Sequence, residues 1–153
     1  MMSGGSGSKI QMMQMQPDAL VNMSGGTPPV SGTKYEWSTD GSVANAIGTQ
    51  KNVKIIGIQI RCTWTVQPTP LEVHVTIDGN VITHTFSNPV SGTHYFATLA
   101  IGSAETNQGL DTSGNVAAYL QPLYEGKSVK VEAEITGGTV SALDMRVKWA
   151  KVV

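Results

Sequence analysis

Three histidines stand at intervals of ten residues, and imidazole is the commonest side-chain ligand of metals in proteins. His74 and His84 fall in two alternating apolar segments joined by Asp78-Gly79, a dipeptide that favours a two-residue hairpin turn. In that hairpin His74 points to the outer face and His84 to the inner face, so they cannot bind one ion. His94 reaches either only through tertiary packing. We therefore expect solvated or core-bound histidines, with no metal site and no cofactor.

The carboxylates do not form an acid/base pair either. Glu132 and Glu134 share one face of a predicted strand with Lys130, which indicates a solvated charge ladder, because a glycosidase needs carboxylates on both sides of the bond. Residues 40–42 and 111–115 resemble fragments of calcium loops, but they lack the alternating oxygen ligands and closing Glu of such loops. We interpret them as turns.

Nucleophile-elbow, phosphate-loop and dinucleotide-binding motifs are all absent from the sequence. Cys62 is the only cysteine, and it lies on the apolar face of an alternating segment, between Ile60 and Trp64. A thiol in that position behaves as a small hydrophobic group, with no cation beside it to activate it. We therefore predict no catalytic residue and no enzymatic activity.

The aromatic residues leave two interpretations open. Trp64 and Trp149 lie among apolar neighbours and are predicted core residues. The rings that could instead stack on a sugar are Tyr35, Trp37, Tyr119 and Tyr124. A stacking site requires two or three exposed rings on one surface, and we favour the core for these rings as well.

The composition narrows the classes of partner. Charged residues make up 14% of the chain, against about 25% in an ordinary soluble domain, and the net charge is −1. Without a basic run, nucleic-acid binding is not expected. No stretch approaches the roughly 20 apolar residues of a membrane span. We also find no signal-peptide pattern, and expect synthesis in the cytoplasm.

Residues 33–153 read as one all-β domain, an antiparallel β-sandwich or jelly roll. Residues 56–66 place Ile56, Ile58, Ile60, Cys62, Trp64 and Val66 on one face. The turn at Asp78-Gly79 pairs Val75 with Ile82 and Leu71 with Phe86. Gly137-Gly138 predicts a second hairpin, and a change of phase after Ala142 predicts a β-bulge. The predicted strands are 33–39, 53–66, 71–77, 81–86, 93–101, 116–120, 127–135 and 139–153.

Residues 1–32 form a different segment, which we call the arm. Its first 30 residues hold six of the seven methionines and only two charges, Lys9 and Asp18. We expect a flexible arm rich in Gly, Ser, Met and Gln, with a short helix opening at Pro17. Its predicted anchors for a partner surface are Met12, Met13, Met15, Leu20, Val21 and Met23, because flexible thioethers adapt to irregular grooves.

Two stretches of the domain form a recognisable pair: Ser91-Gly92-Thr93-His94-Tyr95-Phe96-Ala97-Thr98-Leu99 and Leu120-Gln121-Pro122-Leu123-Tyr124-Glu125-Gly126-Lys127-Ser128-Val129-Lys130-Val131. They resemble the later strands of C1q/TNF-like jelly-roll modules. The resemblance covers roughly the C-terminal half and implies a jelly roll that trimerises. In general style the chain is similar to small all-β bacteriophage virion proteins, such as head-decoration or fibre-base subunits.

These features predict a non-enzymatic structural protein. It would be a virion subunit, a capsid decoration or a tail or fibre component, that forms a homotrimer and contacts other subunits such as a capsid protein. The alternative is a carbohydrate-binding β-sandwich module.

Overall fold

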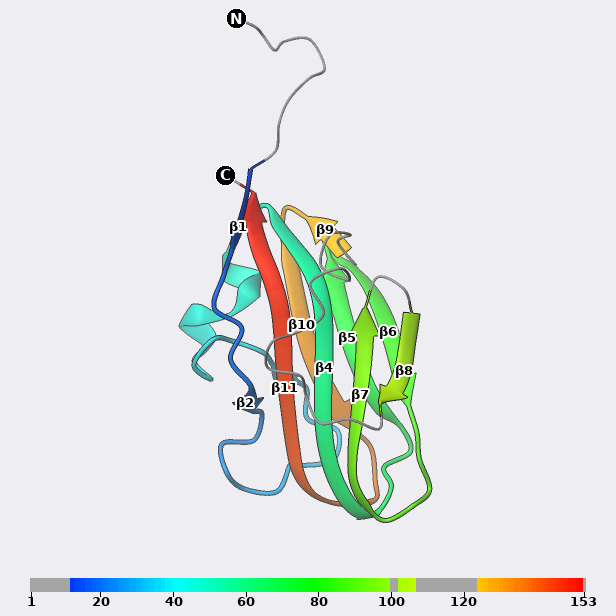
Figure 1. Cartoon of the computed structure of the whole chain (residues 1–153). Helices are drawn as coiled ribbons and strands as arrows, with labels where there is room; N and C mark the ends of the chain where they lie inside the picture. Colours follow the sequence, from blue (N-terminus) through cyan, green and yellow to red (C-terminus); the bar gives the residue numbers. More distant parts are fainter. Residues whose placement is uncertain (1–11, 100–101, 107–123, 153) are drawn as a thin grey trace, which may run out of the picture.

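Two antiparallel sheets face each other in the computed structural model, which describes residues 12–99, 102–106 and 124–152 (Figure 1). The predicted all-β sandwich is confirmed, while its assignment as a jelly roll stays a prediction. The seven-stranded sheet contains β1 (Met13–Met15), β2 (Val21–Asn22), β4 (Val53–Val66), β7 (Gly92–Leu99), β8 (Gly102–Thr106), β9 (Tyr124–Gly126) and β11 (Thr139–Val152). The four-stranded sheet contains β3 (Tyr35–Glu36), β10 (Val129–Ile135), β5 (Leu71–Ile77) and β6 (Asn80–Phe86), in the order β3-β10-β5-β6.

Two short 3-10 helices, η1 (Val43–Asn45) and η2 (Ile47–Thr49), connect β3 to β4. Ile47 of η2 is fully buried and belongs to the core between the sheets. Among the described residues, no helix is long and apolar enough to cross a membrane.

The hairpin predicted at Asp78-Gly79 is confirmed, with its register. Val75 pairs with Ile82 and Leu71 with Phe86. Asp78 and Gly79 have φ values of 48° and 90°, the left-handed conformations that a tight two-residue turn requires. Local turn chemistry and apolar alternation agree here, so the sequence determines the pairing.

The second predicted hairpin, at Gly137-Gly138, is wrong. Both glycines have positive φ, but β10 pairs with β3 and β5 in the four-stranded sheet, and β11 pairs with β4 in the other. The turn therefore carries the chain from one sheet to the other. A Cβ on Gly138 would lie 2.7 Å from the carbonyl carbon of Gln67, which belongs to the connection between β4 and β5. A glycine is therefore needed where the turn between β10 and β11 passes this connection.

The predicted phase of the long strand β4 is correct from Ile58 to Trp64 and wrong at both ends. Ile55, not Ile56, joins the core cluster, because the register with β11 shifts beside Gly57. Val66 is 58% exposed. The predicted β-bulge in β11 is present, one residue earlier than expected, where the register shifts between Val140 and Ala142.

Other predicted strands differ in extent. Regular pairing in the predicted strand 33–39 is limited to β3, and the predicted strand 93–101 ends at Leu99 and is followed by β8, which the pattern did not predict. The predicted strand 116–120 lies outside the described residues.

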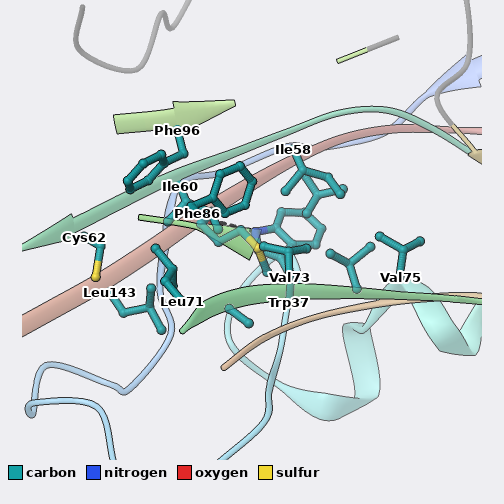
Figure 2. Close-up of a cluster of buried hydrophobic side chains, with 14 of the residues drawn as sticks. Trp37, Ile58, Ile60, Cys62, Leu71, Val73, Val75, Phe86, Phe96 and Leu143 are labelled. Atoms are coloured by element: carbon teal, nitrogen blue, oxygen red, sulfur yellow. Dashed lines mark hydrogen bonds between the residues drawn. The ribbon is translucent and has the colours of Figure 1, made fainter. Parts of the chain in front are cut away.

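Trp37 lies at the centre of the core rather than on a surface. Its side chain is completely buried among residues of both sheets, including Ile58 of β4 and Val73 of β5 (Figure 2). Its indole Nε1 donates a hydrogen bond of 2.9 Å to the backbone carbonyl oxygen of Met145 in β11. A residue that follows β3 is thus bonded to the opposite sheet.

Replacing Trp37 by Ala should lower the free energy of unfolding by about 3–5 kcal/mol, because it removes a large buried ring. Trp37→Phe should lose about 1–3 kcal/mol, since the carbonyl of Met145 is left unsatisfied. Denaturant titration measures both, with Val90→Ala, at a side chain that is 63% exposed, as a control expected within about 0.5 kcal/mol of the parent. A Trp37→Ala variant as stable as that control would contradict the placement of Trp37.

Candidate functional site

The arm, as far as the structure describes it, lies along the edge of its own sandwich. Met13–Met15 form β1 and pair with Val152 to Ala150 of β11, and Val21–Asn22 form β2 and pair with Met145 and Asp144 (Figure 1). Residues 12–23 therefore do not form the free flexible arm expected from their composition. The physical reason is that β11 has an edge on this side, whose backbone N–H and C=O groups the arm satisfies.

Between β1 and β2 the chain is held by polar contacts, which we call the latch. The Asp18 carboxylate lies 3.1 Å from the Arg146 guanidinium and 3.4 Å from the Lys148 ammonium nitrogen. Arg146 Nε also donates to the backbone carbonyl of Asp18, and Trp149 Nε1 donates to that of Pro17 at 3.0 Å. These carbonyls accept side-chain donors, and the short helix predicted at Pro17 is absent.

The latch is strong because its cations have little contact with water. The side chains of Arg146 and Lys148 are 11% and 7% exposed, and hydrogen bonds between charged groups strengthen as solvent is excluded. Asp18 is the only acidic residue in the first 30 positions. Its long-range role was not predicted, because the sequence does not tell which strand faces it.

The six predicted anchors divide into two groups. Val21 and Met23 pack against the core of their own domain, and the backbone N–H of Met23 donates to Leu143. The other four remain exposed: Met12 by 65%, Met13 by 43%, Met15 by 52% and Leu20 by 38%. Within the described chain, no strand pairs with the outer side of β1. The exposed methionines thus lie on an open sheet edge, which we call the methionine edge.

The aromatic candidates do not gather on one surface. Trp37 is buried, which excludes it as a stacking platform. Tyr35, on β3, is half-buried and its hydroxyl accepts a hydrogen bond from the backbone N–H of Val30. Tyr124, on β9, is half-buried and hydrogen-bonded to His84. Tyr119 lies outside the described residues.

The three histidines lie in three different environments. His84 lies on the inner side of β6 against Tyr124, and burial lowers the pKa of the imidazole while it raises the pKa of the phenol. His94 is buried on β7 and stacks on Trp64 with ring centroids 4.5 Å apart. His74 lies on the outer face of the four-stranded sheet, as predicted, but it is only 8% exposed and contacts Glu72 and Glu134. The fold therefore does not bring the three histidines together.

Comparisons with protein-family models, curated proteins and solved structures find no match for this chain.

Cys62 is buried and unpaired with another cysteine, as expected. Burial, helped by the nearby Asp144 carboxylate, raises the pKa of its thiol from 9.0 to about 12. Ellman's reagent should therefore leave the native protein unlabelled at pH 8 and label it on unfolding. Rapid labelling of the native protein would contradict the buried placement.

The same thiol predicts a component of the pH dependence of stability. As pH rises from about 9 to about 12, the unfolded chain loses the Cys62 proton and the folded chain keeps it, so stability falls by up to about 1.4 kcal/mol per pH unit. Cys62→Ala should remove this component. Urea titrations of both proteins across that range measure the difference, and identical slopes would show that the thiol does not contribute.

Replacing Asp18 by Asn should release the arm without unfolding the sandwich. Loss of the charge weakens the bonds to Arg146 and Lys148 by about 1.5–3 kcal/mol. Hydrogen exchange of the β1 and β2 amides should therefore accelerate by tenfold or more, while exchange in β5 stays unchanged. Glu132→Gln, which removes the charge of a carboxylate paired with Lys130 on the four-stranded sheet, is the matched control. Equal exchange rates in the two variants would show that the latch does not hold the arm.

Proposed function

We propose that this chain is a non-enzymatic structural subunit that assembles with copies of itself through its sandwich and arm. The observation that carries the proposal is the methionine edge: exposed Met13 and Met15 on the edge strand β1, and exposed Met12 directly before it, held in place by the latch. Edge strands accept a further strand by main-chain hydrogen bonding, and the side chains alongside provide apolar contact area.

A second exposed apolar surface supports a ring-shaped assembly. Val81 and Ile82 of β6 are 59% and 41% exposed, and β6 forms an edge of the four-stranded sheet. This edge lies on the side of the sandwich opposite to β1 (Figure 1). Two different patches on opposite sides fit a heterologous contact, in which the methionine edge of one copy meets β6 of the next. Such contacts form a ring when the rotation between successive copies closes, and the resemblance to C1q/TNF-like modules implies closure at three.

The size of these patches fits cooperative assembly better than an isolated pair. Full burial of a large apolar side chain contributes roughly 1.5–3 kcal/mol, so three methionines contribute at most about 4.5–9 kcal/mol, which does not exceed the roughly 4–15 kcal/mol that association costs. In a closed ring each copy uses both patches at once, and the contacts reinforce each other. The low charge of the chain reduces repulsion between copies.

We propose that such a ring is part of a virion. It would serve as a capsid decoration or as a tail or fibre subunit in contact with a capsid protein. What supports this is the combination of a weakly charged β-domain with a methionine-rich arm. The carbohydrate-binding alternative now depends on Tyr35, Tyr124 and Tyr119. The hydroxyls of Tyr35 and Tyr124 are already hydrogen-bonded, and their half-buried rings lie on different strands, so the described geometry does not favour it.

The test of assembly is the mass of the full chain in solution by light scattering. The parent should form a closed oligomer, expected to be a trimer. The triple variant Met12→Gln, Met13→Gln, Met15→Gln should be monomeric, because it keeps the backbone pairing of β1 and loses the apolar contact.

The double variant Val66→Gln, Val90→Gln is the control, since these valines are 58% and 63% exposed but lie outside the two edges. It should keep the mass of the parent. A monomeric parent, or a triple variant that still assembles, would overturn the proposal.

A further inference from the structure

The outer face of the four-stranded sheet contains a cluster of three metal-ligating side chains, Glu72, His74 and Glu134. Glu72 and His74 lie on β5, and Glu134 lies on β10 directly opposite Glu72. His74 Nε2 lies 2.9 Å from Glu134 Oε1 and 3.8 Å from Glu72 Oε1. One ligand atom from each residue lies within 4.8 Å of the other two.

The cluster stands on the two inner strands of the sheet, which fixes the backbone beneath it. Its side chains are more buried than an outward-facing position suggests: the exposed fractions are 10% for His74, 17% for Glu134 and 24% for Glu72. Ligands on adjacent, paired strands keep their spacing, and partial exclusion of water strengthens the attraction for a cation.

The negative charges of the cluster exceed the positive charges beside them. Glu72 and Glu134 are like charges directly across two strands, an arrangement that destabilises a sheet. Within the described part of the chain, the only basic group within ion-pair distance of either carboxylate is His74 itself. Lys130, the lysine nearest along β10, pairs with Glu132, which stands opposite His74.

Further carboxylates on the same face increase this excess of negative charge. Glu36 of β3 stands opposite Glu132. Burial, with repulsion from Glu132, raises the pKa of Glu36, while Lys130 opposes the shift. The face therefore carries four glutamates, two of which have no permanent positive charge beside them.

The imidazole of His74 is oriented by a hydroxyl on the next strand. Its Nδ1 lies 2.9 Å from Thr83 Oγ1 of β6, which leaves Nε2 directed at the two carboxylates. Without an ion, Nε2 carries a proton that it donates to Glu134. With an ion, this proton leaves, Nδ1–H donates to Thr83, and the Nε2 lone pair binds the metal. Such hydrogen bonds from the second ring nitrogen are typical of metal-ligating histidines.

We propose that Glu72, His74 and Glu134 form a binding site for a divalent transition metal ion, with zinc as the best fit. One imidazole nitrogen and two carboxylate oxygens match the ligands that zinc accepts, at about 2.0–2.2 Å each, and water completes the coordination. Tetrahedral ligands at that distance stand about 3.4 Å apart, between the two observed separations of the imidazole nitrogen. The imidazole disfavours calcium and magnesium, which prefer oxygen ligands alone. The ion would clamp β5 to β10.

Calorimetric titration of the metal-free full chain with zinc chloride tests the site. We expect one ion per chain and a raised melting temperature, because the ion binds the folded state. Glu134→Gln and His74→Asn should each weaken binding at least tenfold, and Thr83→Val about tenfold. Glu132→Gln, on the same face but outside the cluster, is the matched control and should weaken binding far less than Glu134→Gln does.

Cobalt replacing zinc provides a second readout. Its visible absorption should indicate four- or five-coordination with nitrogen in the parent, and this signal should vanish in His74→Asn. Melting curves in EDTA establish that each variant folds. The proposal is overturned if the folded parent does not bind zinc, if Glu132→Gln and Glu134→Gln bind equally, or if magnesium binds as tightly as zinc. In each case the cluster is only a histidine lying between two carboxylates.

Discussion

The pairing of β4 with β11 is the interaction on which the rest of the structure depends. These two 14-residue strands run antiparallel from Thr139 opposite Val66 to Lys151 opposite Val53. All other strands of the seven-stranded sheet attach to this pair: β7 and β9 to β4, β1 and β2 to β11, and β8 through β7. The inner side of β11 also accepts the hydrogen bond of Trp37, which joins the two sheets. The outer edge of β11 is where the arm binds.

The arrangement separates apolar edges from a charged face. The methionine edge and the exposed residues of β6 lie at opposite edges of the sandwich. At each edge, the outer side of the last strand has no partner strand among the described residues. The outer face of the four-stranded sheet instead carries Glu36, Glu72, Glu132 and Glu134 against Lys130. Like charge disfavours the stacking of two such faces, which leaves the edges for contacts between copies. The surface therefore favours lateral association of sandwiches over face-to-face association.

The sequence pattern correctly predicted those structural features that depend only on residues close together in the chain. The hairpin at Asp78-Gly79 was predictable because turn residues and alternation determine the same register, and the bulge in β11 because it changes the phase of the apolar residues. The turn at Gly137-Gly138 was misassigned because positive φ is equally suited to a hairpin and to a crossing between sheets. Trp37 was left open because an aromatic beside a short strand has no periodicity to place it.

The candidate sites depend on contacts that are distant in sequence. Asp18 meets Arg146 and Lys148 across more than 120 positions, and Glu134 meets His74 across 60. Both require knowledge of which strands are neighbours. Pairing of β10 with β5 places Glu132 and Glu134, which the sequence pattern assigned to a solvated charge ladder, beside His74. This order of strands is determined by packing of the whole core rather than by any one segment.

The central claim, that the open side of β1 is an assembly edge, is tested most directly by hydrogen exchange as a function of protein concentration. The β1 amides that face away from β11 are compared in dilute and concentrated solutions of the full chain. We predict that they become protected as concentration rises, together with amides on the outer edge of β6, while the amides between β4 and β11 stay unchanged. Exchange at β1 and β6 that is independent of concentration, in samples whose mass shows assembly, would contradict the claim.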